Sequence, residues 1–328
     1  MQVFTQNAGC MLKHGPTFLA ATWSGDVDAR TTPEHGLYQE DTRFLSRLVL
    51  QLNQQAPLLL QATVSHDSRC LTTHLTNPQL LLESGHVLPK RTIHLVRTSL
   101  LWEHVLYQQL VITSCSAEPC LVALTLSLDA DFADVFEIQG YARSADGRRE
   151  IAHGPDGQLG FRYTGADALE RRATVGFTSR PAWLDETTAS MVLTLQPQQS
   201  RICGWSVALS SMLAEPAVWS FAQADQRHRA AITHADLHAT INTSQTLLQH
   251  WLDQSIADIE MLLTRREHIW YPDAGLPWCR APAGRDGIFT ALALLWYRPE
   301  IARGVLTYLA ATQATTYDSR RGAEPAKS

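Results

Sequence analysis

The sequence lacks several features that would place it in a common class of protein. Its 328 residues contain no apolar run of the roughly 18–20 residues that a membrane span needs. The N-terminal residues 1–6 have neither the charged head nor the long apolar stretch of a signal peptide. Only 18% of the residues are charged and the net charge is −5, so the basic field that binds nucleic acid is missing. We therefore expect a soluble, cytoplasmic protein whose partners are neither membranes nor nucleic acids.

Cysteine is also scarce, and the common cofactor motifs are missing. The six cysteines are spread along the chain without a C-x-x-C pair, so neither a disulfide scaffold nor a zinc site is indicated. There is no phosphate-binding G-x-x-x-x-G-K-[ST], no G-x-G-x-x-G after a strand and no H-E-x-x-H. His234 and His238 are four residues apart but lack a third ligand nearby, so we interpret them as exposed polar side chains. The sequence predicts no metal and no cofactor.

What the sequence does have is enough apolar material for a large core, at 45% hydrophobic residues. From about residue 17 to 209 the apolar residues alternate with polar ones, as in the runs 48–52, 122–128 and 191–195. Alternation of this kind is typical of strands in antiparallel sheets with one buried face. Many short strands separated by turn signals predict two packed sheets. We assign residues 1–215 to a β-sandwich domain.

The apolar period changes after Pro216. Residues 216–241 are polar and predict a linker that is in part helical. Asn242, with Gln245 three residues later, has the pattern of a helix-capping box, and an apolar stripe then runs from Leu248 to Leu262. A loop is expected over 271–284, and further helices over 286–297 and from Pro299 through 309. Residues 242–328 therefore form a separate helical part.

An acidic segment, 129–137, contains Asp129, Asp131, Asp134 and Glu137. A calcium loop would need a sharp, glycine-containing turn within the segment, but aromatic residues interleave the acids and Gly140 falls outside it. We interpret the segment as a strand end whose aromatics pack inward and whose carboxylates are solvated or paired to arginine.

The stretch 271–287 carries most of the chemical information. It contains three prolines and three glycines around a helix start at which Trp278, Arg285 and Asp286 stand close together in the sequence. Proteins bind sugars with such groups, because an aromatic face covers the C–H face of the ring while charged groups hold its hydroxyls. A structural Arg–Asp pair beside a core tryptophan explains the pattern equally well, so both interpretations stay open on chemistry alone.

Nearly the whole chain resembles a known family. The matching segments are 12–19 with Gly25-Asp26, 36–38, 41–46, Leu101-Trp102-Glu103, 129–140, Gly275-Leu276-Pro277-Trp278, Gly284-Arg285-Asp286-Gly287 and 302–313. These resemble bacterial and archaeal amylo-alpha-1,6-glucosidase proteins of the glycogen debranching type.

The resemblance implies a mainly β fold: a large antiparallel, supersandwich-like β-sandwich followed by helices of a six-hairpin α/α toroid. It implies that Arg285 and Asp286 bind the glucose unit at the cleavage site, with Trp278 as a wall of the sugar pocket. Two carboxyl groups on opposite sides of the glycosidic bond would perform hydrolysis, and no cofactor is implied.

The resemblance is incomplete in the helical part. About twelve helices close such a toroid, whereas the residues after Asn242 supply about three. The catalytic carboxylates are therefore expected outside this sequence and stay unidentified. Cys279 and Ala283 also stand where the family usually has aromatic residues.

The leading hypothesis is the N-terminal portion of a glycoside hydrolase acting on α-glucan, inactive alone, with a partial glucose subsite. Its partners would be an α-glucan or oligosaccharide, and a complementing C-terminal half or a second copy of the chain. The alternatives are a free-standing module that binds α-glucan or another protein without catalysis, and a split enzyme completed by a separate chain.

Overall fold

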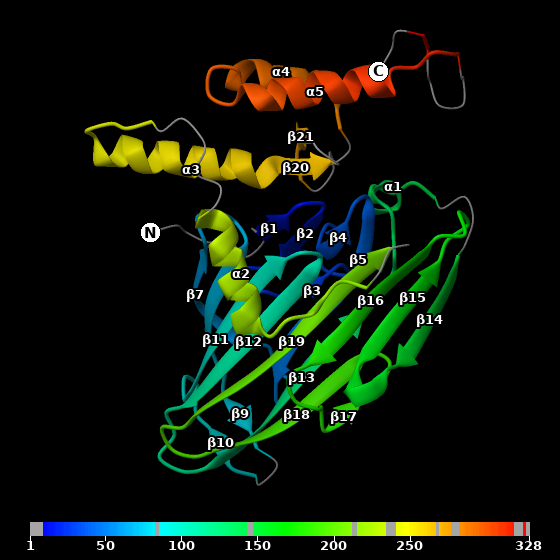
Figure 1. Ribbon diagram of the computed structural model, residues 1–328. Coiled ribbons are helices and arrows are strands. Elements are labelled where there is room, and N and C mark those ends of the chain that lie inside the picture. The colour runs from blue at the N-terminus through cyan, green and yellow to red at the C-terminus, as the bar shows by residue number, and fades with distance from the viewer. Residues whose placement is uncertain are drawn as a thin grey trace. The chain divides into compact units, whose positions relative to one another are not determined.

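The chain divides into two compact units, residues 1–229 and 230–328. The computed structural model describes residues 9–82, 85–142, 147–211, 215–233, 241–266, 269–276, 282–317 and 324–325. Five α-helices lie in the described ranges, and most of the remaining elements are antiparallel strands (Figure 1). None of the described helices is both long enough and apolar enough to cross a membrane.

The first unit is built around an eight-stranded antiparallel sheet and a five-stranded antiparallel sheet. Across the large sheet the strands are β14 (Arg148–His153), β15 (Leu159–Thr164), β16 (Glu170–Phe177), β19 (Ser200–Ser211), β12 (Val105–Ser114), β11 (Ile93–Trp102), β8 (Cys70–Thr76) and β7 (Leu58–Val64). Across the second sheet they are β17 (Trp183–Leu184), β18 (Thr188–Leu195), β13 (Cys120–Asp129), β6 (Arg47–Leu52) and β3 (Val27–Asp28).

The two sheets share one hydrophobic core, which confirms the predicted sandwich. Leu48, Leu50 and Leu52 of β6 are fully buried and belong to the same cluster as Leu95 of β11 and Val207 of β19. The alternation in β6 and β13 is seen directly in their burial, with every second side chain inside. The period of two therefore places one face of each strand in the core.

Smaller elements complete this unit. A four-stranded sheet contains β1 (Cys10–His14), β2 (Thr17–Ala21), β4 (Gly36–Gln39) and β5 (Thr42–Leu45), and a two-stranded one contains β9 (Leu80–Leu81) and β10 (Val87–Leu88). The short helix α1 (Val135–Ile138) follows β13, and a 3₁₀ turn spans Pro155–Gly157.

Inside the sandwich a buried polar network centres on Arg97 of β11. Its guanidinium lies 2.5 Å from Asp26 and 3.0 Å from the Gln108 side-chain oxygen. The same Gln108 oxygen accepts a hydrogen bond from the Trp205 indole at 2.7 Å, and Asp26 accepts one from the Leu50 backbone at 3.0 Å. The network therefore connects both sheets through a fully enclosed cation.

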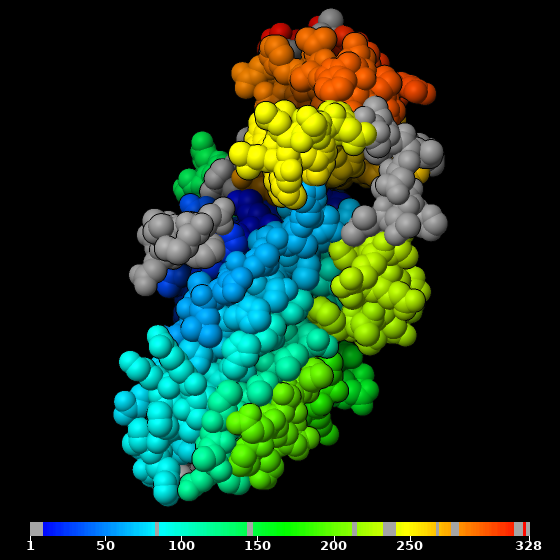
Figure 2. Space-filling model, turned by 90° about the vertical axis from the view of Figure 1, so that its left-hand side faces the viewer, coloured from blue at the N-terminus to red at the C-terminus, as the bar shows by residue number. Residues whose placement is uncertain are grey.

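Helix α2 (Phe221–Thr233) lies within the segment 216–241 that we expected to be a linker. Ala224 of this helix is fully buried in a cluster with Leu100, Trp102 and Tyr107 of the large sheet, and His228 lies 2.9 Å from Asp67. Figure 2 shows the yellow-green surface of α2 against the lighter blue strands.

The second unit contains α3 (Thr246–Leu262), the hairpin β20 (Leu263–Arg266) and β21 (Ile269–Pro272), α4 (Gly284–Leu294) and α5 (Pro299–Thr312). Its core joins Leu263, Tyr271, Leu294, Ile301 and Val305. As predicted, Pro299 occupies the first turn of α5.

Two details of this unit differ from the expectation. The predicted capping box at Asn242 is wrong, because α3 begins at Thr246 after Gln245, which makes no side-chain cap. Instead, the Gln249 side chain accepts from the Thr243 backbone at 2.9 Å and donates to the Ile241 carbonyl at 3.1 Å. The loop expected over 271–284 is also wrong at both ends, because Tyr271 and Pro272 belong to β21 and Gly284 begins α4.

Candidate functional site

Two of the three predicted sugar-binding residues lie in the first turn of α4. The Arg285 Nε and an Asp286 oxygen are 3.1 Å apart, and the two side chains are 82% and 40% exposed. A pair this exposed contributes little to stability. The charged groups are therefore accessible to a ligand, while Trp278 lies outside the described residues.

The start of α4 is fixed by a tyrosine beneath it. Tyr271 is fully buried, and its hydroxyl donates a hydrogen bond to the Ala283 carbonyl at 3.1 Å. A Cβ on Gly287 would lie 2.5 Å from that hydroxyl, so only glycine permits this approach. Burial raises the pKa of Tyr271, which keeps the hydroxyl a donor. Arg285 and Asp286 thus project from a rigidly held turn.

A buried carboxylate, Asp273, follows β21 in the same stretch. It accepts a hydrogen bond from the Thr264 hydroxyl at 2.7 Å, and its second oxygen faces the Arg266 guanidinium at 3.8 Å. Its backbone N–H donates to the Leu262 carbonyl at 2.9 Å. These contacts join the end of α3 to the hairpin, so Asp273 has a structural role that the sequence did not reveal.

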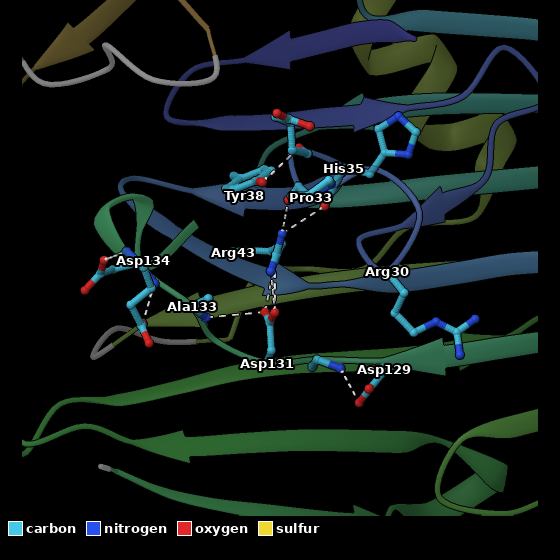
Figure 3. Close-up of polar contacts among 12 residues, drawn as sticks. Arg30, Pro33, His35, Tyr38, Arg43, Asp129, Asp131, Ala133 and Asp134 are labelled. Carbon is cyan, nitrogen blue, oxygen red and sulfur yellow. Dashed lines mark hydrogen bonds and ion pairs between the residues drawn. The ribbon is translucent and has the colours of Figure 1, made fainter. Parts of the chain in front are cut away.

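A second candidate site lies in the first unit, in the acidic segment 129–137. Arg43 of β5 directs its guanidinium at Asp131, with Nη2 2.5 Å from one carboxylate oxygen. On its other side it donates to the carbonyls of Pro33 and His35 at 2.5 and 3.3 Å (Figure 3). The ion pair with Asp131 raises the pKa of Arg43, although burial works in the opposite direction. The segment is therefore anchored to β5 through a cation whose side chain is only 8% exposed.

The expectation that these carboxylates pair with arginine is confirmed for Asp129 and Asp131. Asp129 forms an ion pair with Arg149, and its side chain also accepts a hydrogen bond from the Ala130 backbone N–H at 2.9 Å. Asp134 and Glu137 instead form the capping box of α1, each accepting the other's backbone N–H at 2.9 Å. All four acids thus have local partners.

The aromatics of this segment point in different directions. Phe132 is buried and stacks on Tyr163 with ring centroids 5.5 Å apart, and its backbone adopts the left-handed region at φ 51°. Phe136 is 62% exposed, so the expected inward packing is wrong for this residue. It meets Tyr141, itself 66% exposed, edge to face at 6.1 Å.

These groups surround an open cavity of about 300 Å³. Its lining includes the aromatics Phe132, Phe136, Tyr141 and Tyr163, the acids Asp134, Glu137 and Asp167, and the cation Arg171. The sequence pointed to the segment through its acids, whereas the cavity depends on residues from β15 and β16 that no local pattern connects to it.

Metal and thiol chemistry were sought among the described side chains. Within the described ranges, no group of three histidine, cysteine or acidic residues could hold a metal ion. Burial raises the pKa of Cys10 and Cys203 to about 12, so both thiols stay protonated and unreactive. His234 and His238 fall outside the described residues.

Comparison with solved structures finds distant likenesses. A "Putative kojibiose phosphorylase from human microbiome" superposes with a TM-score of 0.44 at 10% identity, over 76% of this chain and 35% of that one. A Synechocystis protein gives 0.39 at 11%, over 64% and 99%, and a galactose mutarotase related enzyme from Lactobacillus acidophilus gives 0.33 at 10%, over 64% and 100%. The chain spans about a third of the phosphorylase. At these scores the likenesses do not bear on function.

No curated protein matches the chain. One protein family does, over residues 12–206 and hence over more than half of the sequence. The matched range runs from β1 into β19, which is most of the β unit. The chain therefore belongs to the family of the N-terminal domain of (some) glycogen debranching enzymes.

Proposed function

We propose that the chain is the N-terminal portion of an amylo-alpha-1,6-glucosidase-like glycoside hydrolase that acts on α-glucan. In this role the β unit supports a helical catalytic domain, of which α3, α4 and α5 are the first part. The family membership supports the β unit's role, and the helical unit supplies the observation that carries the rest.

That observation is the exposed apolar face of α4. Phe289 and Leu292 of α4, and Trp296 in the turn that follows the end of the helix at Leu294, are 64%, 66% and 72% exposed. Ile288 and Leu295 extend this surface, which we call the α4 face. An apolar face of this extent usually marks an interface. In a helical toroid each helix packs between neighbouring helices. The α4 face therefore fits a helix that would be covered by helices other than α3 and α5.

The partial glucose subsite consists of Trp278, Arg285 and Asp286. Support comes from the exposure of the Arg285–Asp286 pair, which packing does not require, and from the rigid turn that carries it. The guanidinium would donate to sugar hydroxyls and the carboxylate would accept from them, both as charge-assisted hydrogen bonds.

Besides a glucose subsite, hydrolysis needs two carboxyl groups, one acting as acid and one as base, at the separation that these roles require. We assign no residue of this chain to that pair, and we propose that the chain alone is inactive. A complementing helical half or a second copy would cover the α4 face.

The purified chain tests this proposal. We expect no glucose release from glycogen, isomaltose or maltose, and we expect self-association or binding of a hydrophobic dye. Leu292→Gln combined with Trp296→Gln should reduce both, whereas Leu81→Gln, on an exposed leucine of the β unit, should change neither. Turnover by the chain that is lost on mutating one of its own carboxylates would contradict the proposal, as would a monomer that binds no dye.

The second candidate is a binding module without catalysis. The cavity beside α1 favours it, because aromatic and charged groups converge there independently of the helical unit. A chain that binds glucan, stays monomeric and gains no activity from any partner would favour this alternative.

A further inference from the structure

The cavity beside α1 has walls suited to a sugar ring. Phe136 and Tyr141 present aromatic surface to solvent although neither contributes to the hydrophobic core. Phe132 and Tyr163, which also line the cavity, form a buried stacked pair. Aromatic faces bind the C–H surface of pyranose rings, and tyrosine adds a polar hydroxyl. The cavity is thus lined by both exposed and buried aromatic rings.

The polar lining suits hydroxyl groups. Arg171 pairs with Asp167 at 2.9 Å, which keeps its guanidinium at the cavity. Asp134 and Glu137 each hold a backbone N–H, and a carboxylate can accept further hydrogen bonds. Among the described lining residues, three acids face one cation, which gives this part of the cavity a negative balance. An anionic ligand is therefore disfavoured, whereas a neutral polyol that donates hydroxyl hydrogens is favoured.

The site is also held in place before any ligand arrives. The Arg43–Asp131 pair anchors the loop to β5, and an isolated bridge joins Thr42 to Asp134, where α1 lies beside β5 in Figure 1. Phe132, which lies between Asp131 and Asp134 in the chain, has a left-handed backbone. A fixed loop loses little conformational entropy on binding.

We propose that this cavity binds a neutral saccharide, namely one or two glucose units of an α-glucan chain. About 300 Å³ lies at the lower end of the range for small-molecule sites, which suits so short a segment. The choice of glucan rests on the proposed function, while the saccharide chemistry rests on the cavity itself. The site would hold glucan on the β unit independently of Arg285 and Asp286.

Titration calorimetry on the full chain tests the proposal with maltotriose and isomaltotriose as ligands. Phe136→Ala and Tyr141→Ala should each weaken binding about fivefold to tenfold, the loss expected for one aromatic platform. Trp183→Ala is the matched control, since Trp183 is 64% exposed on β17 and does not line the cavity. It should bind like the parent.

Arg285→Ala and Asp286→Ala separate this site from the proposed subsite. Binding that is weakened by Phe136→Ala but not by Arg285→Ala supports the cavity, even if the glucose subsite fails. Binding that is weakened only by Arg285→Ala or Asp286→Ala overturns the cavity proposal and leaves the proposed function intact. Absence of binding to either trisaccharide at millimolar concentration also overturns it, as does tighter binding of glucose 6-phosphate than of glucose.

Discussion

Replacing Asp131 by alanine removes the only carboxylate that the structure places on the Arg43 guanidinium, within the described residues. Arg43 would keep its bonds to the Pro33 and His35 carbonyls, but its charge would stay buried without a counterion. Loss of a partner from a buried pair costs about 3–5 kcal/mol. Since Asp131 is about a third exposed, water reduces that cost, and we expect the unfolding free energy to fall by about 2 kcal/mol.

Urea denaturation followed by circular dichroism measures this change. Asp225→Ala is the matched control, because Asp225 pairs with Arg229 across one turn of α2 and that arginine is 75% exposed. Loss of this pair should leave the unfolding free energy nearly unchanged. Asp131→Ala should also weaken trisaccharide binding, because the loop that carries Phe132 loses its anchor. Equal unfolding free energies for Asp131→Ala and Asp225→Ala would refute the argument that the buried guanidinium sets the cost.

Three further predictions concern packing, an ion-pair network and pH. Gly304→Ala should destabilise the helical unit by about 1–3 kcal/mol, since the added Cβ would lie 2.3 Å from the Trp270 carbonyl oxygen. As the control, a Cβ at Gly275 would meet nothing within 4 Å, so Gly275→Ala should leave the unfolding free energy unchanged. Arg298→Met should cost about 2 kcal/mol by removing the buried cation that pairs with glutamates in α3 and α5, and a thermal melt matching the parent would exclude this. Burial lowers the pKa of His14 to about 3, so between pH 6.5 and 3 the unfolded chain binds a proton at this residue and the folded chain does not. The unfolding free energy should therefore fall as the pH falls, by up to about 1.4 kcal/mol per pH unit. His14→Gln should flatten this dependence of the unfolding free energy on pH.

The sandwich could be predicted from the sequence because burial alternates within single strands. Leu48, Leu50 and Leu52 lie in the core for the same reason that they alternate with polar residues. The hairpin of β20 and β21 could not, because its strands are four residues long and β20 follows α3 without a break. The helix start was misplaced because Gln249 reaches back to the loop, a contact that residue preferences at the cap do not encode.

The candidate sites divide in the same way. Arg285 and Asp286 are neighbours in the sequence, so their pairing is local and was predictable. The cavity brings Phe132 together with Tyr163 and Arg171, and only the tertiary fold connects those segments. The sequence feature that pointed to this cavity was the interleaving of aromatic and acidic residues in 129–137. That pattern does not tell which aromatic side chains are exposed: Phe132 is buried, whereas Phe136 is exposed.

Burial divides the residues discussed above into those whose replacement destabilises the fold and those whose replacement does not. Arg97 and Arg43 are enclosed and bound by several partners, so changing either one damages the sandwich whether or not a ligand exists. Arg285 and Phe136 are largely exposed, and the fold would be little altered without them. A loss of glucan binding without a loss of stability can therefore arise only at residues of the second kind. For that reason the exposed residues, rather than the buried ion pairs, are the ones whose substitution can report on function.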